Sequence, residues 1–522
     1  MPPQLALPLC FAVVALATLT VAPLEAATIH RGLGPEPDSL HIHQAQGLAA
    51  VNLLRDIREG LVTFDVNGEP VPGQAASWQV LDSGRRYRFT LRPEARWSNG
   101  DPVIAADFVR AWRRAVTAET TATTAGLLKD VRHAEDILAG RAEPGELGIR
   151  AIGPGELEVE LNRAAPWILE ILAHPVTFPL HAESADDPRG APVNGPFLLQ
   201  EWSPRARIQL VRNEQYYAVD SVQPDGIDYH PIEEPATELA LYRAGELHIT
   251  ETIPAGRFKW LQEHLANELR INPYLGSFWL GLNFNHPVLG SSRDLRRALA
   301  LAIDRDILTR TVLGAGELAG WSVVPPGIVG YEPATMPERN MNQEAREAEA
   351  RRLYQRSGAG HSKPLLLELR YNTSAVHRRV AVAVASMWKQ VLGVNTELVN
   401  EEWKVFVNNR RLGIVTQVFR GGWIADYADP SSFLDLFASD SSLNNNFYKD
   451  VRFDELMGSA QTSAGAARLE LLHQAETQLV QDMPVIPLYY YVSRHLVSPL
   501  IAGYENNVRD IHLSRYLKLE TP

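Results

Sequence analysis

Residues 365–433 constrain the fold most, because strand and helix patterns alternate within them. Residues 365–371 form a short apolar run, and residues 394–398 alternate between apolar and polar side chains, as strands do. Between these segments, apolar side chains recur every four residues from Val376 to Trp388. That spacing places them on one face of a helix, so the order strand, helix, strand is predicted.

The ends of these elements also have local signals. Ser374 is a suitable N-cap for the first helix, and Gly393 is a suitable residue to end it. A second, short helix is predicted over residues 403–411, and residues 414–419 are predicted to form the next strand. Strands that alternate with helices pair in parallel, so an α/β fold is expected.

Polar and aromatic side chains follow each predicted strand. His377 comes after the first strand and Trp403 after the second, while Arg420, Trp423 and Asp426 follow the third. Ligands bind at the carboxyl ends of the strands in such sheets, so these side chains are predicted to line one edge. The alternative is that each tryptophan packs in the core and each charge is solvated.

Five segments together resemble one protein family. Residues 87–112, 371–379, 400–407, 420–433 and 485–497 are similar, in order, to the periplasmic oligopeptide-binding proteins of ABC importers. The resemblance covers nearly all of the expected mature chain and is closest to the peptide branch of the cluster C binding proteins, which includes the murein-tripeptide binder. It implies an α/β fold of the type II periplasmic binding protein kind, with two ligand-clamping lobes and an extra α/β domain.

The resemblance also implies that the chain crosses repeatedly between the lobes. One lobe is expected to combine residues 27–56, 179–273 and 492–522. The extra domain is expected at residues 57–178 and the second lobe at residues 274–491.

The first residues are typical of a secretion signal. Residues 5–21 are apolar, and Ala26 offers a small residue before cleavage, so residues 1–26 are expected to be removed. Residues 1–9 contain no Lys or Arg, which leaves a membrane anchor as the alternative. The only cysteine, Cys10, lies in this segment, so disulfides and thiolate metal sites are not expected in a periplasmic mature protein.

Composition and missing motifs exclude several functions. The chain has 62 acidic and 50 basic residues, a formal net charge of -12 and no long basic run, which disfavours nucleic-acid binding. It has no zincin, serine-hydrolase or phosphate-loop motif, so no enzyme is predicted. His41 and His43 have no companion ligand nearby, and neither a metal site nor a cofactor is predicted.

The resemblance assigns roles to charged residues. Asp426 corresponds to the family's aspartate that binds the peptide ammonium. Family histidine and arginine residues bind peptide carboxylates, and His377 and Arg420 match them, with either Arg410 or Arg411 as a further cation. Independently of the family, His377 lies in the first turn of its predicted helix, where the free N–H groups favour an anion.

Other residues are expected to contact the peptide backbone and side chains. A bound peptide would add a strand between the two lobes, a mode that reads backbone more than sequence. The resemblance implies that the backbone contacts come from Gly422, Trp423 and Ile424 in one lobe and from Gln46, Gly47 and Leu48 in the other. The candidate pocket walls are Trp403, Trp423, Tyr491 and Trp279.

Two departures from the family leave the ligand open. No lysine is present near Leu313, where peptide binders often have one, and Phe278 and Trp279 stand in a segment that is usually tyrosine-rich. The expected function is capture of a short peptide by a monomer and delivery to an inner-membrane ABC permease. The alternatives are a murein fragment, a metal chelate or a sugar as ligand, and a secreted hydrolase.

Overall fold

The computed structural model describes most of the chain after the expected leader. The described residues are 27–45, 47–117, 124–183, 190–361, 364–414 and 416–520. The predicted secretion signal and Gln46 therefore lie outside the described residues.

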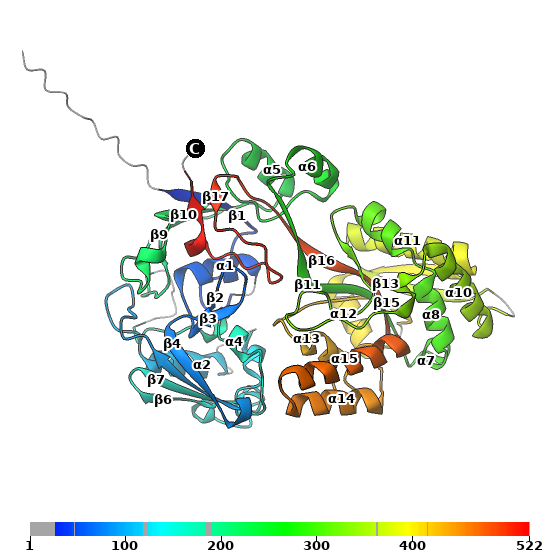
Figure 1. The fold of residues 1–522 in the computed structure, drawn as a ribbon, viewed down its shortest axis with the longest axis horizontal. Helices are drawn as coiled ribbons and strands as arrows, with labels where there is room; N and C mark the ends of the chain where they lie inside the picture. Colours follow the sequence, from blue (N-terminus) through cyan, green and yellow to red (C-terminus); the bar gives the residue numbers. More distant parts are fainter. Residues whose placement is uncertain are drawn as a thin grey trace, which may run out of the picture.

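Two sheets form the side of the molecule drawn at the left of Figure 1. One has the order β1-β10-β9-β8 and the other has the order β4-β5-β7-β6. The strands of the first are β1 (Thr28–Gly34), β8 (Phe197–Ser203), β9 (Arg207–Arg212) and β10 (Gly226–Pro231). The strands of the second are β4 (Ala75–Leu81), β5 (Arg86–Leu91), β6 (Ile149–Gly153) and β7 (Glu156–Glu160). Two short pairs are β2 (Val62–Phe64) with β3 (Pro70–Pro72), and β17 (Ile501–Ala502) with β18 (Lys518–Leu519).

A mixed six-stranded sheet forms the other side, with the order β12-β16-β11-β15-β13-β14. Its strands are β11 (Leu269–Leu282), β12 (Leu318–Ala319), β13 (Leu366–Asn372), β14 (Asn395–Glu401), β15 (Val418–Ile424) and β16 (Val485–Leu496).

The helices fall into the same two sides. The first side has α1 (Leu48–Ile57), α2 (Ala105–Ala115), α3 (Ala134–Leu138), α4 (Ile168–Ile171), α5 (Pro235–Arg243) and α6 (Phe258–His264). The second has α7 (Pro287–Ser291), α8 (Arg293–Leu301), α9 (Arg305–Ile307), α10 (Gln343–Arg356), α11 (Ala375–Leu392), α12 (Trp403–Leu412), α13 (Ser431–Leu434), α14 (Val451–Thr462) and α15 (Gly465–Asp482).

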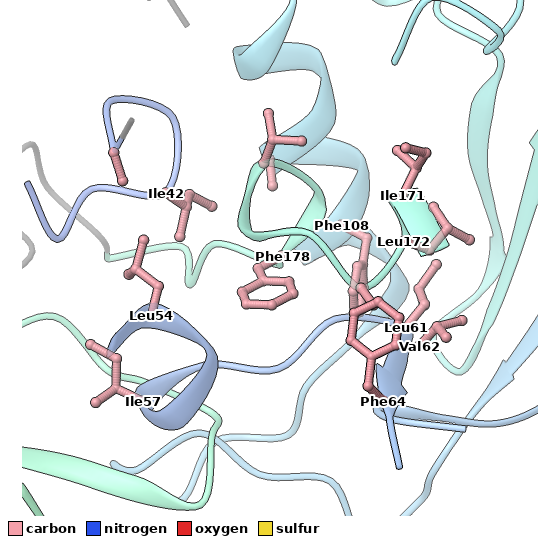
Figure 2. Packing of buried hydrophobic residues seen from close by; sticks show 14 of the residues in the cluster. Ile42, Leu54, Ile57, Leu61, Val62, Phe64, Phe108, Ile171, Leu172 and Phe178 are labelled. Carbon is pink, nitrogen blue, oxygen red and sulfur yellow. The ribbon is translucent and has the colours of Figure 1, made fainter. Parts of the chain in front are cut away.

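The expected first lobe and the expected extra domain share one hydrophobic core. Leu54 and Ile57 of α1 belong to the same buried cluster as Phe108 of α2 and Phe178. Figure 2 shows these side chains together with those of β2 and α4. Because burial of apolar surface stabilises a fold roughly in proportion to area, a common core makes these two units one stable body.

The second lobe packs helices on both faces of its sheet. Along β11, Phe278 and Leu280 join the cluster that contains α8 and α11, while Trp279 joins the cluster that contains α14 and α15. This alternation is what a strand that is buried on both faces requires.

The predicted strand and helix order of residues 365–433 is confirmed. β13 pairs in parallel with β14 and with β15, and the Ser374 hydroxyl accepts the His377 N–H as an N-cap. The third strand begins at Val418 rather than Ile414 and continues to Ile424. The prediction that Arg420 to Ile424 follow the strand is therefore wrong. They lie within it, because antiparallel pairing of Gly276–Leu282 in β11 extends β15.

The long strands β11 and β16 connect the two sides. They run side by side from the region of α5 and α6 into the six-stranded sheet (Figure 1). Their pairing is regular from Leu269 to Pro273 and is interrupted between Pro273 and Ser277. Two of the predicted domain boundaries, at 273/274 and 491/492, fall inside these strands. The other sheets lie within the predicted ranges, and the boundaries themselves stay a prediction.

Candidate ligand-binding site

A cavity of about 480 Å³ lies between the two sides of the molecule. Its walls come from α1 and α4, from the end of β15 and from the C-terminal segment. The lining residues used below are Leu48, Arg55, Glu170, His174, Glu251, Ile424, Asp426, Tyr427, Arg509 and Asp510. The cavity is therefore built by segments that are far apart in the sequence, as expected for a ligand site between lobes.

Asp426 follows β15 directly and faces this cavity. Its backbone N–H donates to the Ser432 hydroxyl over 3.2 Å, and the Trp423 indole Nε1 lies 3.4 Å from the same oxygen. The side chain still reaches solvent through the open cavity. The surrounding protein already reduces its hydration, which raises the pKa of the carboxyl, and Lys129 partly offsets this effect. A carboxylate in such surroundings gains much from a bound cation.

The outer part of β15 has a free edge. Within the described sheet, β13 pairs with β15 only at Val418 and Phe419. Gly422 and Ile424 lie beyond that pairing, so their outward backbone groups are available to an added strand. Gly421 cannot carry a side chain, because a Cβ atom there would lie 2.2 Å from Trp279 Nε1.

Two arginines, Arg410 and Arg420, and one histidine, His377, gather at the inner end of this edge. The Arg420 guanidinium lies 5.3 Å from the centre of the Phe278 ring, and the His377 ring lies 5.5 Å from the same ring. Burial and then Arg420 lower the pKa of His377 to about 4, and the same two causes lower the pKa of Arg410 to about 10. Among the described residues, Arg410 Nε, Arg420 Nε and His377 Nδ1 have no hydrogen-bond partner. Such a cluster favours an anionic ligand.

The structure distinguishes Arg410 from Arg411. Arg410 lines a small cavity of about 50 Å³ together with Gly422, Trp423 and Trp279. Arg411 is exposed and lies 3.3 Å from Asn408 on its own helix. Tyr491 also reaches this region, because a Cβ atom on Gly422 would lie 3.2 Å from its hydroxyl oxygen.

Some predicted residues are placed differently from the expectation. Trp403 is 50% exposed at the start of α12 and lines neither of these cavities. Leu48 does line the large cavity, but it begins α1 instead of forming a strand edge, and Gly47 is the extended residue that precedes the helix. Leu313 is only 8% exposed and packs in the α8 and α11 cluster, so a lysine there would be buried among apolar side chains.

Several cavity residues were missed by the sequence analysis. Arg55 and His174 lie in the wall, and burial lowers the pKa of both, to about 10 and about 3. Arg509 lies 3.0 Å from Glu170, whose carboxylate also accepts the Ala428 N–H. No local motif marks these residues, since distant segments of the chain bring them together.

The loop that carries Asp426 is fixed to the first side of the molecule. The Tyr427 ring stacks on Trp167, with ring centres 4.7 Å apart and planes within 9°. Tyr427 belongs to the core cluster that contains α1 and α2. Within three residues of Ile424, the polypeptide therefore passes from the second lobe to the first side of the molecule.

The comparisons with known proteins agree with this architecture. The profile for bacterial extracellular solute-binding proteins, family 5 middle, matches residues 69–445, which is most of the chain. The chain belongs to the family 5 bacterial extracellular solute-binding proteins. The type II periplasmic binding fold expected from the sequence is thereby confirmed.

Individual family 5 proteins are similar over nearly the whole chain. The periplasmic oligopeptide-binding protein OppA of Salmonella typhimurium is 36% identical, covering 91% of this chain and 89% of that protein. The probable deoxycholate-binding periplasmic protein YgiS of Escherichia coli is 34% identical, covering 93% and 92%. The unliganded open form of the murein tripeptide-binding protein MppA matches with a TM-score of 0.87 at 33% identity, covering 95% and 98%. The present arrangement is thus similar to that of an unliganded, open family 5 protein.

Two general properties follow from these relatives. They are periplasmic proteins that bind ligands, and none of them is named as an enzyme. In the part of the chain that the structure describes, no helix has the length and apolar character needed to cross a bilayer.

Proposed function

We propose that this protein captures short peptides in the periplasm and delivers them to an inner-membrane ABC permease. The observation that carries the proposal is the free edge of β15, with a carboxylate at one end and a cationic cluster at the other. A zwitterionic peptide has complementary charges at its two ends, and its backbone can pair with the edge between them.

The positions of the charged groups limit ligand length. Asp426 and Arg420 are six residues apart along an extended segment, which spans at most about 20 Å. A ligand that reaches both ends would then be a peptide of no more than about six residues. Asp426 would hold the ammonium, and Arg420 with Arg410 and His377 would hold the carboxylate.

Secretion and the absence of catalysis are part of the same proposal. Cleavage after Ala26 would release the mature chain into the periplasm, where it would act as a monomer. It would return its ligand unchanged, since its relatives are named for binding. The name of YgiS supports a second candidate ligand, an amphipathic carboxylate such as deoxycholate.

A competition experiment tests this proposal. The mature protein, freed of ligand by unfolding and refolding, is titrated calorimetrically with tri- to hexapeptides, their N-acetylated forms and deoxycholate. We expect micromolar or tighter binding of at least one free-amine peptide, with the ligand recovered intact by mass spectrometry. Binding of deoxycholate alone would replace the proposal with the second candidate. Steady release of cleaved peptide would show a hydrolase.

A further inference from the structure

A group of metal-binding side chains lies outside the candidate peptide site. His495, near the end of β16, faces Asp510 and His512 of the C-terminal segment, and their ligand atoms all lie within 4.8 Å of one another. The His495 Nε2 atom is 2.8 Å from Asp510 Oδ1, and the His512 Nε2 atom is 3.1 Å from the same oxygen. Two imidazole nitrogens thus converge on one carboxylate oxygen.

The hydrogen bonds of His495 show which of its two ring nitrogens carries a proton. Its Nδ1 atom is 2.9 Å from the Thr250 carbonyl oxygen, which can only accept, so Nδ1 must carry a proton. In the neutral ring Nε2 then has a lone pair that points at an acceptor oxygen. A cation between the two atoms, either a proton or a metal ion, is needed to make the contact favourable.

The second histidine is also held in place. The His512 ring stacks on Tyr504, with ring centres 4.0 Å apart. Its backbone carbonyl accepts a hydrogen bond of 2.9 Å from Arg31 of β1. Rings that are fixed before binding lose little freedom when they take up a ligand.

The surroundings favour positive charge. All three side chains line a cavity of about 20 Å³, which is large enough for one water or ion. The same cavity is lined by Asp56 and Glu251, while Arg31 is its only guanidinium among the described residues. Arg31 faces Asp56 and donates to Ser514, so its charge is partly neutralised.

We propose that His495, Asp510 and His512 bind a divalent transition-metal ion, with Zn²⁺ as the best match. Two imidazole nitrogens and a carboxylate oxygen form a typical ligand set for this ion. Around tetrahedral Zn²⁺ such atoms lie about 3.3 Å apart. The two measured separations are a few tenths of an ångström shorter, so small side-chain movements would complete the site. The Thr250 carbonyl already supplies the outer hydrogen bond that orients a ligating imidazole.

The ion would cross-link parts of the chain that lie far apart in sequence. It would tie the C-terminal segment to β16, which runs between the two sides of the molecule. Asp510 and Glu251 also line the large cavity, so the ion would lie behind the wall of the peptide site without contacting the charged groups at its ends.

The test is calorimetric titration of ZnCl₂ into the untagged, chelator-treated protein in metal-free buffer. We expect one ion per chain with micromolar or tighter affinity, and a higher Tm with zinc than without it. Asp510→Asn and His512→Gln should each weaken binding at least thirtyfold. Replacement of zinc by Co²⁺ should give visible absorption typical of tetrahedral nitrogen and oxygen ligation in the unaltered protein, and this absorption should be lost in Asp510→Asn and His512→Gln.

The control is His230→Gln. His230 lies 3.2 Å from His30 in a different histidine group on β1 and β10, so this change should leave zinc binding intact. Circular dichroism and a cooperative thermal unfolding transition confirm that each variant is folded. The proposal is overturned if the unaltered protein binds no zinc at 100 µM, or if folded Asp510→Asn binds it as tightly. Equal loss in His230→Gln would show that the ion binds elsewhere.

Discussion

The two ends of the candidate peptide site are built in opposite ways. At the ammonium end, a single carboxylate faces an open cavity and its pKa is raised by burial, with Lys129 as the nearby opposing charge. At the carboxylate end, burial and the nearby Arg420 charge lower the pKa of both His377 and Arg410. At one end Lys129 offsets the carboxylate charge only in part, and at the other end like charges lie close together, so a bound zwitterion would relieve the electrostatic strain at both ends.

Removal of the carboxylate should have the largest effect. Asp426→Asn should cost about 3 kcal/mol in the binding of peptides with a free amine, or roughly 150-fold in Kd, because the ammonium is left unpaired. Calorimetry with the same peptide before and after N-acetylation forms a double-mutant cycle. Equal losses for both peptides would mean that Asp426 is structural and does not contact the amine.

Removal of Arg420 should have a smaller effect, since Arg410 and His377 remain to hold the peptide carboxylate. Arg420→Ala should cost about 2 kcal/mol, or roughly thirtyfold in Kd, for peptides with a free carboxylate, and less for C-terminally amidated peptides. It should also raise the pKa of His377, which burial and Arg420 lower to about 4, and NMR titration of both proteins would measure this change. Arg411→Ala is the matched control and should change neither quantity, because Arg411 is exposed. If Arg411→Ala lowered the affinity as much as Arg420→Ala, Arg411 would have to contact the peptide carboxylate.

Leu48 in α1 should contribute to the binding of a peptide regardless of whether the peptide's termini are charged. Leu48 is 63% exposed in the open form and would lose part of that exposure on closure. Leu48→Ala should therefore weaken all peptides by about 1 kcal/mol, whatever their termini. Leu366→Ala, at a leucine that is 60% exposed and lines neither cavity of the site, is the control and should have no effect. A loss of affinity confined to amidated or to acetylated peptides would show that Leu48 contacts one terminus of the bound peptide.

The smallest expected effect is proton linkage of opposite sign at the two ends. A bound carboxylate should raise the pKa of His377 from about 4, so the complex takes up protons and affinity rises as pH falls from 6.5 towards 4. A bound ammonium should lower the pKa of Asp426, which releases protons. Calorimetry in buffers of different ionisation enthalpy measures the net change. His377→Gln should abolish the uptake, and uptake that persists would assign it to another group.

Local signals explain why part of the fold was predictable. The α11 helix has its cap at Ser374 and its end at Gly393 within the same short stretch of sequence, and both are confirmed. The start of β15 was displaced because its pairing with β11 involves residues more than a hundred positions away. Propensity over a few residues does not report such a partner.

The candidate site shows the same division. Asp426, Arg420 and His377 were identified from one continuous stretch, and the structure places Asp426 in the large cavity and the two cations at the far end of β15. Arg55 and Arg509 contribute to the same cavity but come from opposite ends of the chain. Their role depends on the shared core and the returning C-terminal segment, which no short motif encodes.

The stacking of Tyr427 on Trp167 has a consequence for the order in which a ligand is engaged. Together with the passage of β11 and β16, it joins the two sides at points close to Asp426. When the lobes rotate, groups near these junctions have a short lever arm and move little, whereas Arg420, about 20 Å further along the strand, moves more. We therefore expect Asp426 to bind the peptide ammonium first, while the lobes are still apart. Arg420 would bind the peptide carboxylate last, when the lobes have closed.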